Sequence, residues 1–113
     1  MVDAGGVWTF LGNLVEDGCS TGAATFLSAA IVNQYGTYLA GSIGQLPATG
    51  SADSTTWLMI SDTTCDSLCC FKSGMKAANV VGDAAPARFV FSGICGDVQC
   101  VSFWDGSVVR QSR

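Results

Sequence analysis

The sequence has no histidine and few charged residues. The absence of histidine from all 113 residues removes Ser-His-Asp and Cys-His catalytic arrangements, together with the commonest metal ligand in proteins. Charged residues make up 12% of the chain and hydrophobic residues 49%, a balance too apolar for a disordered chain. We therefore expect one folded domain, residues 1–113, whose sparsely charged surface favours self-association.

Basic residues are missing from the first 71 positions. The five that occur come later and leave a net charge of -4; they are Lys72, Lys76, Arg88, Arg110 and Arg113. Proteins that bind nucleic acids neutralise phosphates with a basic surface, and no basic run is interleaved with aromatic residues here. The composition therefore predicts no nucleic-acid partner.

Long hydrophobic runs are also missing. No charge occurs between Gly18 and Ala52, but the apolar stretch inside that segment, residues 23–32, is interrupted by polar residues after about ten positions. A membrane-spanning helix needs about twenty apolar residues, so we predict no membrane span. The first residues also lack the basic and apolar regions of a secretory signal peptide, as the mature form of an exported protein would.

Hydrophobic spacing predicts secondary structure along the first two thirds of the chain. Trp8, Leu11, Leu14 and Val15 recur at helical intervals, which predicts a short amphipathic helix over residues 6–16. Later apolar runs predict strands at 25–32, 37–40 and 57–60, and the glycine, proline and hydroxyl residues of 41–55 predict a loop. Residues 65–78 fit either a short helix or a hairpin.

The C-terminal third has the pattern of an antiparallel meander. Residues 88–95 and 98–104 flank Gly96-Asp97, a two-residue connection typical of a hairpin, and Asp105-Gly106 predicts a second turn into residues 107–110. Together with the predicted helix, this indicates an α+β fold in which one or two short helices pack on an antiparallel sheet.

Carboxylates are the remaining candidates for catalysis. Asp62 with Asp66, and Asp97 with Asp105, could pair for acid-base chemistry, but all four lie in predicted turns, where aspartate is favoured for local hydrogen bonding. No phosphate-binding glycine motif occurs. We therefore expect a protein that is not an enzyme and that needs no cofactor.

Six cysteines leave three interpretations open. Disulfides in an exported protein suit the even number, although six cysteines allow 15 pairings. Free buried thiols are the second interpretation, and a zinc site without any C-x-x-C pair is the third. The residues concerned are Cys19, Cys65, Cys69, Cys70, Cys95 and Cys100.

Three tryptophans belong either to the core or to a site for sugar or proline-rich ligands. Planar rings can stack on both kinds of ligand. Core packing is the simpler role for Trp57 and Trp104, whereas Trp8 lies near an end of the chain. We expect Trp8 to be the exposed one.

The order of these segments resembles profilin, a small actin-monomer-binding protein. Residues 7–18, with their Trp, Asn-Leu and closing Asp-Gly, resemble the family's first helix. Residues 29–32 and 38–42 resemble its first strand pair, and residues 85–91 and 101–103 its late hairpin. The region between Ala40 and Trp57 is too short for the family's second helix, and no counterpart of its C-terminal helix is present.

The resemblance implies a cytoplasmic protein of the cytoskeleton that binds actin or an actin-like partner. It places Trp8, Phe10 and Asn13 in a partner-binding helix, and Lys72, Lys76 and Arg88 in the region that would meet an acidic partner. The cysteine content and the sparse charge support the alternative of an extracellular, disulfide-braced module for binding or self-assembly.

Overall fold

The computed structural model describes residues 1–113 and contains only β-structure. The predicted α+β class is therefore wrong, as is the profilin-like arrangement of a helix across a sheet. The nine strands are β1 Gly6–Asp17, β2 Thr25–Tyr35, β3 Tyr38–Ile43, β4 Leu46–Ala52, β5 Trp57–Ser61, β6 Thr64–Cys65, β7 Cys69–Ala77, β8 Ala84–Cys95 and β9 Val98–Ser112. No helix of the length and apolarity needed to cross a membrane is present.

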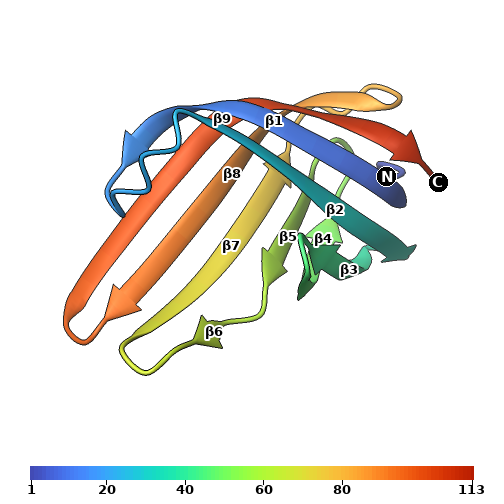
Figure 1. Ribbon diagram of the computed structural model, residues 1–113. Coiled ribbons are helices and arrows are strands. Elements are labelled where there is room, and N and C mark those ends of the chain that lie inside the picture. Colours follow the sequence, from blue (N-terminus) through green and yellow to red (C-terminus); the bar gives the residue numbers. More distant parts are fainter.

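The strands form one antiparallel sheet that closes on itself. Their order is β5-β4-β3-β2-β1-β9-β8-β7-β6, and β5 pairs in addition with β7, which makes an eight-stranded barrel with β6 as a short appendage. Figure 1 shows the long strands β7, β8 and β9 side by side, with the shorter β3, β4 and β5 across the barrel. Closure satisfies the backbone hydrogen bonds that open sheet edges would leave exposed.

The segment predicted as a helix is strand β1. Trp8 and Phe10 point inward and are fully buried, whereas Leu11 and Val15 point outward and are more than half exposed, so the true period is two. The apolar residues of this segment matched helical spacing because the barrel also carries apolar residues on its outer face. Hydrogen-bonded neighbours on both sides, β2 and β9, hold the segment extended.

Two further predictions about local structure are also wrong. The predicted loop at 41–55 contains β4, whose small and hydroxyl residues occupy alternate faces. The predicted turn at Asp105-Gly106 lies inside β9, where Gly106 faces Gly12 of β1 and Ala87 of β8. A Cβ atom at position 106 would lie 1.9 Å from the Leu11 carbonyl oxygen, so this glycine permits close strand approach and makes no turn.

The remaining strand predictions are confirmed in place, although the strands are longer than expected. Residues 25–32, 38–40 and 57–60 belong to β2, β3 and β5, Thr37 lies in the turn before β3, and the Gly96-Asp97 connection joins β8 to β9. Of the two alternatives for 65–78, the hairpin is correct, since β6 pairs with β7.

Large side chains fill the barrel interior. Trp8 lies against Trp57 with ring centroids 5.4 Å apart, and Phe26 stacks on Trp104 at 4.9 Å. An eight-stranded barrel is just wide enough for its side chains to fill it. All three tryptophans are buried, so the expected exposure of Trp8 is wrong and none of the three forms a surface for sugars or prolines.

Arg110 of β9 closes one end of the barrel. Its guanidinium donates hydrogen bonds to the carbonyl oxygens of Asp3, Gly5 and Gly82 and to the Asp83 carboxylate, and it lies 4.5 Å over the Trp8 ring. The side chain is only 3% exposed. This cation therefore ties the N-terminal segment and the β7–β8 connection to the core.

Disulfides link the chain at the other end of the long strands. All six cysteines are paired, as Cys19–Cys100, Cys65–Cys70 and Cys69–Cys95. Of the three interpretations of the cysteines, disulfide bonding is the correct one, and sulfurs so bonded are neither free thiols nor thiolate ligands for zinc.

Candidate functional site

Three adjoining hollows lie on the outer face of β7 and β8. Their volumes are about 390, 280 and 450 Å³. The first and second share Lys72 and Ser92, and the second and third share Lys76 and Arg88, so they follow one another along the strands. We call them together the outer groove. Its charged side chains, Lys72, Lys76 and Arg88, are exposed on the outer face of the barrel, so this part of the groove is separate from the core.

The middle of the outer groove has an apolar floor. Ile60 of β5, Gly74 of β7 and Val90 of β8 are neighbours across the sheet, and Leu58 lies beside them. Gly74 has no side chain to fill the space between its branched neighbours. A Cβ atom added there would have the Met59 carbonyl oxygen as its nearest contact, at 3.7 Å. The hollow therefore results from one glycine in an otherwise branched row.

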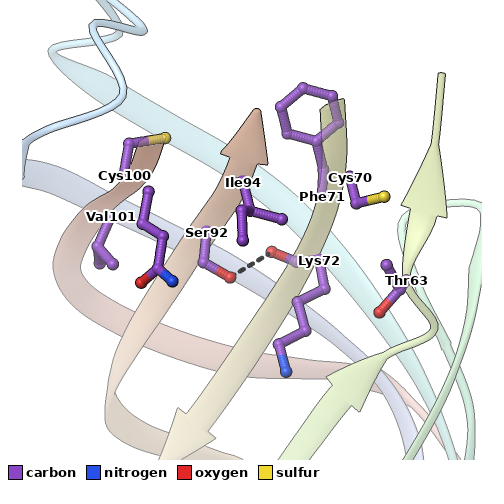
Figure 2. Close-up of a pocket in the computed structure, with 10 residues that line it drawn as sticks. Thr63, Cys70, Phe71, Lys72, Ser92, Ile94, Cys100 and Val101 are labelled. Atoms are coloured by element: carbon purple, nitrogen blue, oxygen red, sulfur yellow. Dashed lines mark hydrogen bonds between the residues drawn. The ribbon is translucent and has the colours of Figure 1, made fainter. Parts of the chain in front are cut away.

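Two lysines flank this floor. Lys72 and Lys76 lie on the same outward face of β7, two alternations apart, and both are exposed. Figure 2 shows the Lys72 side chain leaving β7 on the side opposite to Phe71, with the Ser92 hydroxyl donating to the Lys72 carbonyl oxygen at 3.5 Å. Neither lysine forms a salt bridge. Their charges are therefore available to an anionic partner.

Arg88 lies beside Lys76 but has a partner of its own. Its Nε and Nη2 donate to the two carboxylate oxygens of Asp105 at 2.6 and 2.9 Å, and its guanidinium lies 4.2 Å over the Phe103 ring. The Arg88 guanidinium lowers the pKa of Asp105, and the carboxylate in turn raises the pKa of Arg88. Arg88 therefore forms a wall of the outer groove with its charge already balanced.

The other predicted partner-binding residues lie elsewhere. Trp8 and Phe10 are fully buried inside the barrel, so neither ring is available at the surface. Asn13 is exposed on β1 and lies opposite Asp105 on β9, which in turn lies opposite Arg88 on β8. The structure thus brings Lys72, Lys76 and Arg88 together and separates them from the two aromatic residues.

The candidate catalytic carboxylates have local structural contacts or lie in turns. Asp66 accepts hydrogen bonds from the backbone N–H groups of Leu68 and Cys69, which lower its pKa, and Asp105 pairs with Arg88. Asp97 lies in the β8–β9 turn, and Asp62 follows β5. One member of each pair, Asp66 and Asp105, is thus engaged in a structural contact.

The apolar floor of the outer groove was missed by sequence reasoning. Lys72, Gly74 and Lys76 alternate along one stretch of chain, which is the signal for a hollow between two cations on a strand face. This alternation indicates a hollow only if residues 65–78 form a strand, and the sequence left a helix equally possible. The contribution of Leu58 and Ile60 depends on the pairing of β5 with β7, which no local pattern shows.

A second surface feature is an exposed apolar cluster on β1, β2 and β9. Leu11 and Leu27 lie opposite each other and are 58% and 67% exposed, and Ile31 and Val109 are nearly half exposed on the same outer side. Exposed apolar clusters of this kind are common at interaction surfaces. We call these four residues the apolar cluster.

Comparison with protein-family models, with curated proteins and with solved structures finds no match to this chain.

Proposed function

We propose that this protein is an exported, disulfide-braced binding module that holds an acidic segment of a partner protein in the outer groove. One observation carries the proposal: the two lysines of the chain lie without ion pairs on either side of an apolar hollow. The rest of this acidic protein repels an acidic partner, so the groove is where attraction is concentrated.

The cysteines support export. Three disulfides and no free thiol suit an oxidising compartment, because cytosolic reductants keep thiols reduced. The cytoplasmic location implied by the profilin resemblance is not supported. We propose an extracellular location.

The shape of the outer groove supports a polypeptide as its occupant. The groove runs from Cys70 along β7 to Ala78, the residue after the strand, a length of about 26 Å at about 3.3 Å per residue. An elongated, open groove of that length suits an extended chain better than a compact small molecule, which prefers an enclosed pocket. The barrel supplies a rigid surface, and we propose no chemical step.

The test is binding of labelled acidic polypeptide to the oxidised protein. We expect a random copolymer of glutamate and leucine to raise fluorescence anisotropy, with weaker binding as salt is added, and an uncharged copolymer of glutamine and leucine to show little or none. Lys72→Gln with Lys76→Gln should abolish the signal. Asn33→Asp, an exposed change on β2 that also makes the protein more acidic, should retain most of it. Equal binding by wild type and the double variant would overturn the proposal.

Self-assembly is a second candidate, and the apolar cluster favours it. Leu11 and Leu27 together expose an apolar pair that a second copy could cover. Sedimentation equilibrium of wild type and of Leu27→Asp tests the idea. We expect wild type to associate at high concentration and the variant to remain monomeric; a monomeric wild type would exclude it. Actin binding stays a prediction that no observation here tests.

A further inference from the structure

We infer that the outer groove selects an extended segment in which two acidic residues lie four positions apart with an apolar residue midway between them. This inference rests on the proposed function and specifies the ligand of the same site. It follows from the match between the spacing of Lys72, Gly74 and Lys76 on β7 and the spacing of alternate side chains on an extended chain.

The two lysines set the distance between the acidic positions. Residues four apart on a strand are about 13 Å apart along it and point to the same face. An extended ligand lying along β7 has the same repeat, so its side chains at positions i and i+4 fall opposite Lys72 and Lys76 together. Adjacent acidic residues would point to opposite faces, and only one of them could meet a lysine.

The hollow over Gly74 sets the middle position. The side chain at i+2 faces Gly74, where the nearest walls are Leu58, Ile60 and Val90. Its volume of about 280 Å³ has room for an aliphatic side chain, and burying that side chain against the floor adds hydrophobic stabilisation. A charged or strongly polar residue at i+2 would bury no apolar surface against Leu58, Ile60 and Val90 and would therefore lack this stabilisation.

The chain's own acidic residues do not fit this pattern. Asp62 and Asp66 are the only acidic pair four positions apart in the sequence, and Thr64 lies between them in place of an apolar residue. The Asp66 carboxylate is also engaged by two backbone N–H groups of its own turn. A second copy of this protein therefore does not supply the segment, and a different acidic partner does.

Two peptides of identical composition test the spacing. The spaced peptide is Thr-Glu-Thr-Leu-Thr-Glu-Thr, and the clustered peptide is Thr-Thr-Glu-Glu-Leu-Thr-Thr. We expect the spaced peptide to bind the oxidised protein about tenfold more tightly by fluorescence anisotropy. Lys72→Gln and Lys76→Gln should each weaken it about fivefold, the upper range for one exposed ion pair.

Filling the hollow provides an independent test. Gly74→Leu places a side chain where the ligand's central leucine would lie, and its Cβ has no close contact to displace. We expect it to weaken the spaced peptide at least tenfold while circular dichroism and thermal unfolding stay as in wild type. Gly74→Ala is the milder companion variant and should weaken binding less.

The outcomes separate the inference from the proposed function. If the two peptides bind equally tightly, or if Gly74→Leu leaves the affinity unchanged, the spacing inference is wrong while acidic binding stands. If the acidic copolymer binds but the spaced peptide does not, the inference is again wrong. If neither the copolymer nor the peptides bind, both are wrong.

Discussion

Removing the Cys19–Cys100 disulfide should destabilise the protein more than removing either of the other two. This bridge joins residues 81 apart in the sequence, whereas Cys69–Cys95 spans 26 and Cys65–Cys70 spans 5. A disulfide restricts the unfolded chain by an entropy that grows with the logarithm of the closed loop. Removing the bridge should lower the free energy of unfolding by about 4.5 kcal/mol for Cys19–Cys100, about 3.5 kcal/mol for Cys69–Cys95 and about 2 kcal/mol for Cys65–Cys70.

We expect the native contacts around the long-range bridge to remain when it is removed, because they do not involve its sulfur atoms. The Gly18 N–H donates to the Val101 carbonyl oxygen at 2.9 Å, and the Cys19 N–H donates to the Ser102 hydroxyl at 2.9 Å. Replacing both cysteines with alanine therefore acts mainly by increasing the conformational entropy of the unfolded chain. The expected difference between this variant and the Cys65→Ala, Cys70→Ala variant is about 2.5 kcal/mol.

Urea unfolding under oxidising conditions measures the difference. The three buried tryptophans make fluorescence a suitable signal, and each variant keeps two disulfides, so the comparison is matched. We expect the Cys19→Ala, Cys100→Ala protein to unfold at the lowest urea concentration. A result in which the short Cys65–Cys70 bridge contributes as much as the long one would refute the loop-entropy argument.

Three further predictions concern the ends of the barrel and the loop after β1. Arg110→Met should lower the free energy of unfolding by about 3 kcal/mol in urea titrations, because it leaves buried carbonyl groups unpaired. Trp8→Phe should cost about 1 kcal/mol more than Trp57→Phe, since the Trp8 indole donates a hydrogen bond and that of Trp57 has no partner. Backbone N–H groups of the following loop lower the pKa of Asp17 to about 2, so its ionised form stabilises the fold above about pH 4 and this contribution is lost as pH falls toward 2. Asp17→Asn should flatten the pH dependence of thermal unfolding in that range.

The sequence predicted part of the outer groove. Lys72, Lys76 and Arg88 were grouped by charge and region, and they do lie on one face of the sheet. The sequence could not predict which of these cations forms an ion pair, because the partner of Arg88 is Asp105 on the neighbouring strand β9. Leu58 and Ile60 complete the floor only because β5 closes the barrel against β7.

The pattern of apolar and polar residues correctly identified some strands and gave the wrong structure for others. The β8–β9 hairpin was recognised because Gly96-Asp97 separates two long apolar runs. Strand β1 was mistaken for a helix because Leu11 and Val15, which point outward, are as apolar as the inward Trp8 and Phe10. When both faces of a strand carry apolar residues, periodicity cannot distinguish the two structures.

Composition and local patterns by themselves determined a folded, acidic, cysteine-rich chain with a C-terminal hairpin. These properties depend on residue types and on contacts between near neighbours. Only the tertiary structure decided the closure of the barrel, the disulfide pairing and the faces of β1, because each depends on which distant segments meet. Cys19 meets Cys100, and β5 meets β7, through long-range strand pairing whose register is set by the whole interior packing at once.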